Sequence, residues 1–310
     1  MKPFGVIVNA RAGAVRRDPG LLERLRGRLS TAQLQVTASE DEIDGALDAL
    51  GAVGIDRLVV VGGDGSVGGT LTRLLDRWPD AELPALVIAP GGTVNTIARS
   101  LGARGSPERL IEKLAAGGAP RVDTLRPLVR AKAEQGETRA GMIFAAGAGV
   151  RWLRLYYEAP RQGPGPAAAL VARIVGSASL RGRLATRVFE PCGVELTVDG
   201  RRLELERFTA LAAASVGGIG LGFRPFLTAG RDPERFHLVI TEAGPARLSV
   251  ELPALRLGLG GALSCLQHHP ARQVSLRFAG PEPWSIDGDV YAPTAALELS
   301  ATRPLRFLVP

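Results

Sequence analysis

The sequence predicts an open parallel-sheet α/β domain followed by a C-terminal antiparallel β-sandwich with helical inserts. Over residues 4–116, apolar strand-like runs alternate with helical spacing and short loops, which is typical of a parallel sheet covered by helices. After about residue 121, strand-like segments follow one another with turn residues between them, which is typical of antiparallel sheets. A chain of 310 residues also has the length of two domains of roughly 150 residues each.

The first domain is expected over residues 1–122. Its predicted strands are short apolar runs at residues 4–9, 34–37, 57–61 and 83–89. Its predicted helices have apolar residues at helical spacing and cover residues 19–29, 40–50, 66–78, 93–101 and 107–116. Gly102 is expected to end the fourth of these helices, because glycine adopts the left-handed conformation that closes a helix.

The second domain is expected over residues 123–310, and its last residues could pack back on the first domain. Strands are predicted at 122–129, 140–146, 186–189, 194–198, 209–216, 236–241, 274–278 and 296–300. Helical inserts are predicted at 167–180 and 248–263, with a mobile loop at 160–166.

Composition indicates a globular protein with an anionic partner. The chain is 45% hydrophobic and 22% charged, with a net charge of +7. Residues 151–189 combine seven arginines and one acid with aromatic and aliphatic side chains. This mixture suits an anionic membrane surface, and it suits a core helix with a solvated basic face equally well. No nucleic-acid motif accompanies the charge, so we expect no nucleic-acid partner.

We expect a cytoplasmic protein with peripheral membrane contact. The N-terminus has no signal-peptide pattern, and the longest apolar run, residues 208–223, is shorter than the roughly 20 residues of a membrane span. Cys192 and Cys265 lack the spacing of metal ligands and are expected to be reduced thiols. A homodimer is compatible with the sequence.

The strongest chemical signal is the turn Gly62, Gly63, Asp64, Gly65 and Ser66, which joins an apolar strand to a helix. Ligands of open α/β sheets bind at the carboxyl ends of strands, and glycines let backbone N–H groups approach phosphate oxygens. A carboxylate beside a phosphate requires a Mg²⁺ ion between them or a role in proton transfer. The alternative is a tight turn in which Asp64 caps a helix, and three glycines with one acid favour the functional interpretation.

Two further loops repeat this arrangement. Gly92, Thr93 and Asn95 follow the next strand, and Asn9 to Gly13 follow the first strand. A Gly-Gly turn with a capping Thr is common by itself, and the loop after the first strand could be an ordinary connection. The two glycine-rich turns, at residues 62–66 and 90–95, would together form one anion cradle.

The segment around Asp287, Gly288 and Asp289 places two carboxylates around a glycine. Asp-Gly is a strong hairpin signal, so the residues by themselves slightly favour a turn with solvated acids. The alternative is a carboxylate that accepts a proton or holds Mg²⁺.

Taken in order, the four elements resemble the diacylglycerol kinase catalytic-domain family, which includes sphingosine kinases and bacterial lipid kinases. The matching segments are residues 9–13, 62–66, 90–95 and 287–289. The Gly-Gly-Asp-Gly element alone is shared with NAD kinases and phosphofructokinases, whereas the ordered set is specific. The resemblance implies a nucleotide domain, a β-sandwich and an active site in the cleft between them.

The resemblance also implies residue roles. ATP would be contacted by Asn9, Ala10, Arg11, Gly13, Thr37, Gly62, Gly63, Asp64, Gly65, Ser66, Gly68, Gly92, Thr93 and Asn95. Asp64 would lie beside Mg²⁺ and the transferring phosphate. Asp289 would accept the proton of a lipid hydroxyl, with Asp287 supporting it and Asp64 as the alternative base. Asp232 would match an acid of a structural Mg²⁺ site.

The chain departs from the family pattern at several of these positions. Ala10 replaces a proline, Ser66 and Asp289 replace Thr and Glu, Thr96 replaces an Asp, and His237 stands where an acid is frequent. The predicted activity is transfer of the ATP γ-phosphoryl group to a lipid hydroxyl of the diacylglycerol or sphingoid kind. The alternatives are a nucleotide-binding protein with weakened turnover, or an NAD or sugar kinase of the same superfamily.

Overall fold

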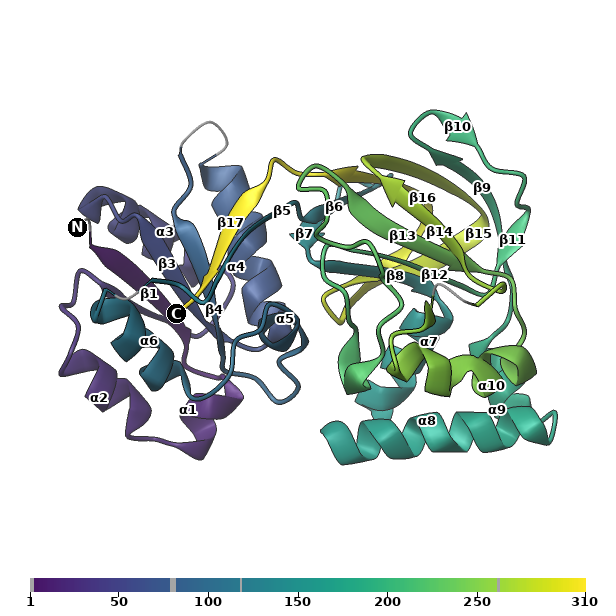
Figure 1. Ribbon diagram of the computed structural model, residues 1–310, viewed down its shortest axis with the longest axis horizontal. Helices are drawn as coiled ribbons and strands as arrows, with labels where there is room; N and C mark the ends of the chain where they lie inside the picture. Colours follow the sequence, from purple (N-terminus) through teal and green to yellow (C-terminus); the bar gives the residue numbers. More distant parts are fainter. Residues whose placement is uncertain (1–2, 79–81, 118, 261–262) are drawn as a thin grey trace. The chain divides into compact units, whose positions relative to one another are not determined.

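The computed structural model describes residues 3–78, 82–117, 119–260 and 263–310, and it divides the chain into two units (Figure 1). Unit 1 comprises Met1–Arg126 and Pro304–Pro310. Unit 2 comprises Pro127–Arg303. The chain therefore leaves unit 1, builds unit 2 and returns to unit 1 at its end.

Unit 1 contains a six-stranded sheet in the order β2-β1-β3-β4-β17-β5. Its strands are β1 (Phe4–Asn9), β2 (Leu34–Thr37), β3 (Arg57–Gly62), β4 (Ala85–Pro90), β5 (Val122–Arg126) and β17 (Leu305–Val309). Neighbouring strands are parallel except β17 and β5. The inner strands β1, β3 and β4 are almost continuously apolar and buried, because helices cover parallel sheets.

The helices described beside this sheet are α1 (Gly13–Arg17), α2 (Leu21–Arg26), α3 (Glu42–Val53), α4 (Asp64–Arg77), α5 (Thr96–Ser100) and α6 (Pro107–Ala115). Helix α3 packs on β2 and α4, α4 packs on β3, and both α5 and α6 pack on β4. The expected parallel-sheet domain is thereby confirmed. The connections put the carboxyl ends of β1, β3 and β4 side by side, each followed at once by a loop and a helix.

Unit 2 is built on an eleven-stranded antiparallel sheet with the path β14-β13-β12-β8-β15-β16-β6-β7, to which β9, β10 and β11 add through β15. The strands are β6 (Val129–Ala133), β7 (Thr138–Gly141), β8 (Ile143–Gly147), β9 (Cys192–Val198), β10 (Arg201–Arg202), β11 (Arg207–Phe208), β12 (Ala210–Ala214), β13 (Phe236–Thr241), β14 (Gln267–Ala271), β15 (Gln273–Ile286) and β16 (Asp289–Ala301).

The long strand β15 connects the two halves of this sheet. It pairs with β9 over Val274–Phe278 and with β8 over Trp284–Ile286, and its register against β16 shifts between these stretches. One apolar core collects side chains from both halves, such as Phe144 and Phe236 with Leu196 and Leu299. The expected antiparallel C-terminal domain is confirmed, and among the residues that the structure describes its sheet does not close into a barrel.

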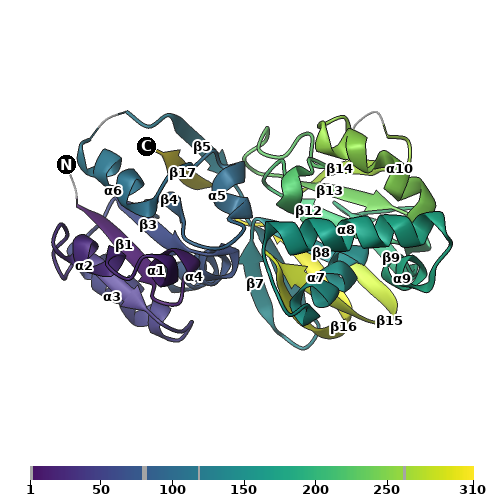
Figure 2. The same cartoon turned by 90° about the horizontal axis from the view of Figure 1, so that it is seen from below.

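Among the described residues, helices α7 (Ala148–Glu158), α8 (Pro164–Ser179), α9 (Arg183–Val188) and α10 (Pro245–Arg256) gather on one side of the unit 2 sheet, as Figures 1 and 2 show. A short 3₁₀ turn, η1 (Gly220–Gly222), lies near α8. A separate cluster that includes Tyr156, Leu170 and Val188 fills the space among α7, α8 and α9. In the part of the chain that the structure describes, no helix is long and apolar enough to cross a membrane.

Several predicted elements differ from the structure. Residues 186–189, predicted as a strand, belong mainly to α9, because Ala185 and Val188 pack on α7 and α8 rather than in a sheet. Helix α8 begins at Pro164, inside the predicted loop 160–166. Helix α5 begins at Thr96 rather than at residue 93, because Asn95 adopts a left-handed conformation with a φ of 55°.

Candidate functional site

Three loops of unit 1 are joined by hydrogen bonds at the carboxyl ends of β1, β3 and β4. Asn9 Nδ2 donates a hydrogen bond to Ser66 Oγ over 2.6 Å, which links the loop after β1 to the loop after β3. Gly91 N donates to Gly62 O over 2.9 Å, and Ala14 N donates to Gly91 O over 2.7 Å. The three loops therefore form one connected surface.

Glycine is required where the loops after β3 and β4 touch. A Cβ on Gly91 would lie 2.6 Å from Gly62 N, and one on Gly92 would lie 2.5 Å from Gly63 Cα. No side chain fits at such distances, since the neighbouring atoms belong to backbone. These glycines consequently allow two loops to pack together, in addition to any approach of a ligand.

Asp64 holds the same two loops together through its carboxylate. Oδ2 accepts a hydrogen bond from Thr96 N over 2.9 Å, and Oδ1 accepts one from Ile97 N over 3.1 Å. Burial raises the pKa of Asp64, while the N–H groups of Ile97 and Thr96 and the charge of Arg99 act in the opposite direction. Asp64 thus caps α5, which begins in the neighbouring loop. The alternative considered from the sequence was a cap on α4, the helix that directly follows Asp64 in the chain.

The helix that begins at Asp64 presents its N-terminus to the cradle. Gly63 is the N-cap of α4, and no side chain caps this end. The first N–H groups of a helix have no partner within it, and the helix dipole makes this end positive. The fourteen-residue helix α4 therefore offers backbone donors and a favourable field for an anion.

The loop after β4 is closed by Asn95. Its Oδ1 accepts from Gly92 N over 2.6 Å and its Nδ2 donates to Gly92 O over 3.0 Å, so both polar ends of the side chain serve the loop. Thr93 lies exposed at the tip of this loop, three residues before α5 begins. Asn95 thus shapes the loop, whereas Thr93 is accessible.

The remaining residues predicted for the nucleotide also lie in unit 1. Thr37, at the end of β2, is buried and pairs with Asn9, and its carbonyl accepts from Ala10 N over 2.8 Å. Arg11 is exposed, and its N–H donates to Asn9 Oδ1 over 2.8 Å. Gly13 starts α1, and Gly68 lies buried inside α4.

In unit 2, Asp287 and Gly288 form the two-residue turn that joins β15 to β16. Both have positive φ angles, 50° and 98°, which is the geometry of a tight hairpin turn. The Asp287 side chain is buried, and its carboxylate accepts from Met142 N and Ile143 N at 2.9–3.2 Å. Asp287 therefore fixes the hairpin against the start of β8.

Asp289 lies at the same hairpin but is exposed. Tyr157 of α7 donates from its hydroxyl to Gly288 O over 2.9 Å, which places a phenol beside the hairpin tip. Two residues of this region were not singled out as site residues from the sequence. They are Tyr157 and Gly141, where a Cβ would lie 2.2 Å from Asp287 Oδ2.

The predicted structural Mg²⁺ site around Asp232 lacks a suitable set of ligands. Asp232 accepts from Glu234 N over 2.9 Å and forms an ion pair with Arg235 at 3.5 Å. Among the described residues, no group of three or more His, Cys, Asp or Glu side chains could hold a metal ion. A metal cage built by the protein alone does not fit this site, because such cages need several oxygen ligands.

His237, where an acid was expected, belongs to a hydrogen-bond chain. Thr228 N donates to His237 Nδ1 over 3.1 Å, and His237 Nε2 lies 3.1 Å from His268 Nδ1. His268 Nε2 lies 3.4 Å from Gly260 O. Burial, together with the nearby charges of His268, His269 and Arg231, lowers the pKa of His237 to about 4. The ring is thereby held neutral, with Nδ1 as acceptor and Nε2–H as donor.

Residues 3–126 match the family model described as diacylglycerol kinase catalytic domain. Among curated proteins, no sequence matches the chain. Among solved structures, the chain is similar to one from Bacillus anthracis str. Sterne described as a "putative diacylglycerol kinase", with a TM-score of 0.70, 15% identity, and coverage of 100% of this chain and 97% of that one.

A second structure from the same organism, described as a diacylglycerol kinase, has a TM-score of 0.61 and 17% identity, with the same coverage of both chains. At such identities the likeness shows the fold alone, and it extends over both units. The match to the family model is independent of it and covers the three loops of unit 1. The resemblance predicted from the sequence is confirmed: residues 3–126 of this chain match the family model of the diacylglycerol kinase catalytic domain.

Proposed function

We propose that this chain is an ATP-dependent lipid kinase that transfers the γ-phosphoryl group to a lipid hydroxyl. The observation that carries the proposal is the connected surface of three loops at the N-terminus of α4, formed within a diacylglycerol kinase catalytic domain. Backbone N–H groups in such a cradle can bind the phosphates and stabilise the charge of the transferring group. Phosphoryl transfer depends mainly on this kind of positioning and charge neutralisation.

Asp64 supports the donor side of the proposed reaction. Its two oxygens already accept backbone N–H groups, so it holds the cradle in shape. Mg²⁺ in kinase sites is commonly held by one or two carboxylates together with substrate phosphates, and a single carboxylate here fits that pattern. When bound, the ion would neutralise charge on the phosphates.

Asp289 is the proposed base for the acceptor hydroxyl. It is exposed at the hairpin, whereas Asp287 is buried and accepts two backbone N–H groups. An accessible carboxylate can take the proton of a hydroxyl as the phosphoryl group is transferred. Asp287 then acts as a positioning residue that holds the hairpin.

The proposed function is tested by incubating the protein with ATP labelled at the γ-phosphate, Mg²⁺ and a total lipid extract. We expect label in an organic-phase product that mass spectrometry identifies as a phosphorylated lipid. A parallel reaction offers NAD and hexoses. Label in NADP or a sugar phosphate, with none in lipid, would replace the proposal with the alternative kinase of the same superfamily.

One observation favours a second candidate, a nucleotide-binding protein with weakened turnover. Asp64 and Asp287, two of the three carboxylates proposed for the reaction, are engaged by backbone N–H groups. Tight binding of a non-hydrolysable ATP analogue without phosphoryl transfer to lipid, NAD or sugar would support this candidate.

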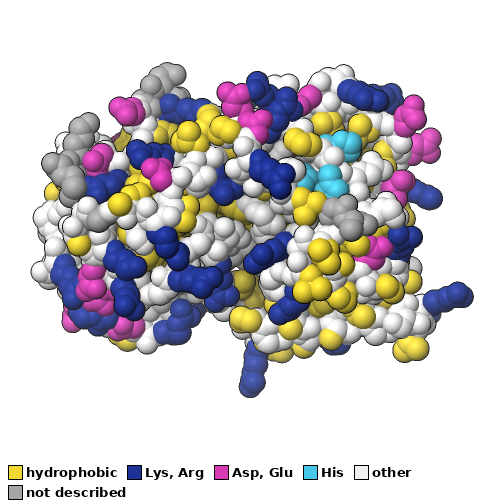
Figure 3. All heavy atoms as spheres, viewed as in Figure 1, with side chains coloured by type: hydrophobic (Ala, Val, Ile, Leu, Met, Phe, Trp, Pro, Cys, Tyr) yellow, Lys and Arg dark blue, Asp and Glu magenta, His cyan; other side chains and the backbone are white. Residues whose placement is uncertain are grey.

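We also propose that unit 2 contacts an anionic membrane through the side that carries α8 and α10. These two helices contact each other, and large apolar side chains on or beside them are strongly exposed: Leu180 (84%), Val250 (80%), Leu257 (74%) and Leu259 (55%). Figure 3 shows hydrophobic side chains and scattered Lys and Arg side chains over this part of the surface. Exposed arginines of the 151–189 segment, such as Arg173 and Arg181, add positive charge, whereas Arg151 is turned inward to Glu190 O and Glu282.

Sedimentation with vesicles tests this membrane contact. Binding to vesicles rich in phosphatidylglycerol is expected to fall several-fold for Val250→Glu, because a charge replaces an apolar contact. The control is Leu125→Glu, the same kind of change at an exposed leucine of unit 1. Equal loss in both variants, or unchanged binding of Val250→Glu, would refute the assigned surface.

A further inference from the structure

A cavity of about 650 Å³ lies in unit 1 beside the nucleotide loops, among α1, α2, α5 and α6. Its wall is formed by Ala14, Arg17, Asp18, Leu21, Pro90, Asn95, Arg99, Ala103, Arg104, Gly105, Ser106, Pro107 and Glu108. This volume is in the range of sites for small organic ligands. Of the residues predicted to contact ATP, Asn95 alone lines the cavity, and its side chain is already committed to Gly92.

The cationic side chains of the wall are available to a ligand. Arg99 and Arg104 are exposed and form no ion pair within the described part of the chain, and Arg17 is exposed with one long bond of 3.4 Å to Gly92 O. Figure 3 shows Lys and Arg side chains gathered over this part of unit 1, interleaved with acids. Three guanidinium groups around one cavity form a set of donors suited to phosphate oxygens.

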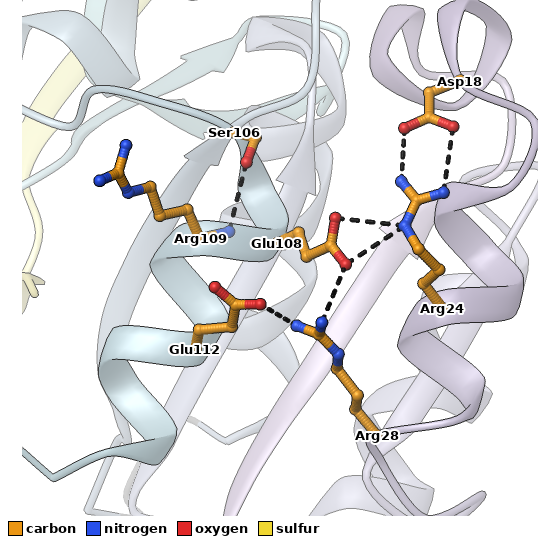
Figure 4. Close-up of polar contacts among 7 residues, drawn as sticks. All are labelled: Asp18, Arg24, Arg28, Ser106, Glu108, Arg109 and Glu112. Carbon is orange, nitrogen blue, oxygen red and sulfur yellow. Dashed lines mark hydrogen bonds and ion pairs between the residues drawn. The ribbon is translucent and has the colours of Figure 1, made fainter.

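The two acids of the wall are neutralised by arginines outside it. Asp18 pairs with Arg24 at 2.5 Å, and Glu108 is held by Arg24 at 3.2 Å and by Arg28 at 3.5 Å (Figure 4). Arg28 also pairs with Glu112 on the next turn of α6. Because the acids are paired in this network, the charge that the wall presents to a ligand comes mainly from the arginines.

The N-terminus of α6 adds to this field. Ser106 is the N-cap and accepts from Arg109 N over 3.3 Å, and Pro107 occupies the first helical position, so both residues lie in the wall at the positive end of a nine-residue helix. Anions are favoured at such an end, and a helix dipole and three arginines act in the same direction here.

We propose that this cavity is a second anion site, beside the nucleotide loops and distinct from the proposed ATP site, that binds a phosphate monoester. The ligand is either a small phosphorylated metabolite or the phosphate headgroup of an acidic lipid, and the chemistry shared by both is a phosphate dianion. The site is connected to the nucleotide loops through two of its arginines. Arg17 contacts Gly92 O, and the charge of Arg99 acts on the Asp64 carboxylate. Occupancy therefore changes the electrostatic surroundings of the loops that the proposed kinase reaction uses.

The site is tested by calorimetric titration of the full chain with glycerol 3-phosphate and with inorganic phosphate, at low ionic strength. The titration is repeated with a saturating non-hydrolysable ATP analogue, which fills the proposed nucleotide site. We expect glycerol 3-phosphate to bind in both conditions. Arg104→Gln should weaken this binding about tenfold, the effect typical of losing one charge-assisted hydrogen bond, and Arg99→Gln should act similarly.

Arg109→Gln is the control, because Arg109 is an exposed arginine of α6 that lies outside the wall, and Figure 4 shows its side chain directed away from the Glu108 network. We expect it to change the affinity less than twofold. An equal loss of affinity for glycerol 3-phosphate in Arg109→Gln and Arg104→Gln would show that only the net charge of the protein matters, and it would overturn the proposal. Displacement of glycerol 3-phosphate by the ATP analogue would also overturn it, since the cavity would then belong to the nucleotide site.

A binding experiment with lipid vesicles distinguishes a lipid headgroup from a soluble metabolite as the source of the phosphate. If phosphatidic acid vesicles bind the chain in a way that requires Arg104, and glycerol 3-phosphate does not bind, the ligand is a lipid headgroup. If glycerol 3-phosphate binds and the vesicles do not, the ligand is a metabolite. Absence of both kinds of binding refutes the site. None of these readouts requires phosphoryl transfer, so the anion site and the proposed kinase activity can fail independently.

Discussion

At the scale of single residues, the structure separates three carboxylates that the sequence presents alike. Asp64 and Asp287 each accept backbone N–H groups from a neighbouring segment, so each stabilises a loop. Asp289 is exposed at the hairpin. Their roles are therefore expected to differ: the first two shape the site, and the third can exchange a proton with a substrate.

Asp289→Asn should lower the rate of phosphoryl transfer about 100-fold or more while leaving ATP binding and thermal stability unchanged. An amide cannot accept the hydroxyl proton, yet it keeps the size of the side chain. The measurements are initial rates with the lipid acceptor, the affinity for an ATP analogue and the melting temperature. Full activity of this variant would remove Asp289 from the mechanism.

Asp287→Ala, two residues earlier, should behave in the opposite way. The Met142 and Ile143 N–H groups would lose a buried charged acceptor, which costs about 2–3 kcal/mol of stability. Denaturant unfolding should show this loss, and Asp289→Asn measured in parallel should not. An unchanged free energy of unfolding for Asp287→Ala would contradict its assigned role in holding the hairpin.

Stability should fall as the pH drops from about 6.5 to 4. The pKa of His237 is about 4 in the folded chain against 6.5 as the ordinary value, so between these values the unfolded chain binds more protons. The contribution of His237 to the free energy of unfolding is fully present above pH 6.5 and is lost as the pH falls to 4. It amounts to about 3 kcal/mol. Denaturant unfolding across this range should show the slope for the natural chain, and His237→Gln should reduce it. Identical slopes would show that other groups, such as His269, cause the acid sensitivity.

At the scale of elements, local sequence patterns predicted most strands and helices but not all of their ends. The segment at 186–189 contains residues that suit a strand, yet it forms part of α9 because it packs on α7 and α8. The start of α5 was missed because the left-handed Asn95 and the capping Asp64 set it, and Asp64 lies far away in the sequence. Contacts between distant segments override local preference at such points.

The contact between the loops after β3 and β4 gives a prediction at this scale. Gly91→Ala should weaken binding of an ATP analogue more than tenfold, because the new methyl group would meet Gly62 N at 2.6 Å and force the two loops apart. Gly45→Ala on α3 is the control, since its Cβ would have no neighbour within 4 Å and alanine favours a helix by up to about 1 kcal/mol. If Gly91→Ala binds the nucleotide as tightly as Gly45→Ala does, the contact between the two loops is not needed for nucleotide binding.

At the scale of the whole molecule, the end of the chain completes the first unit. Strand β17 inserts between β4 and β5, and Leu305, Phe307 and Val309 are buried there. Without it, the sheet of unit 1 would lose its contact between β4 and β5. Residues 1–126 by themselves therefore lack a strand of their own domain.

Phe307→Ala is expected to destabilise unit 1 by roughly 3–5 kcal/mol, the usual cost of removing a buried aromatic ring. Hydrogen exchange resolved by segment should show the loss of protection in the strands of unit 1 and leave the strands of unit 2 protected. Uniform loss in both units, or none in either, would contradict the assignment of β17 to unit 1.

The sequence by itself determined the class of both domains and the resemblance of residues 3–126 to the diacylglycerol kinase catalytic domain. It did so because strand and helix periodicity, glycine-rich turns and the order of motifs are local properties of the chain. Tertiary structure alone decided that Asp64 caps α5, that Asp287 is buried while Asp289 is exposed, and that arginines of α1, α5 and the following loop share one cavity. Each of these facts depends on segments distant in sequence meeting in space, and no local pattern records such a meeting.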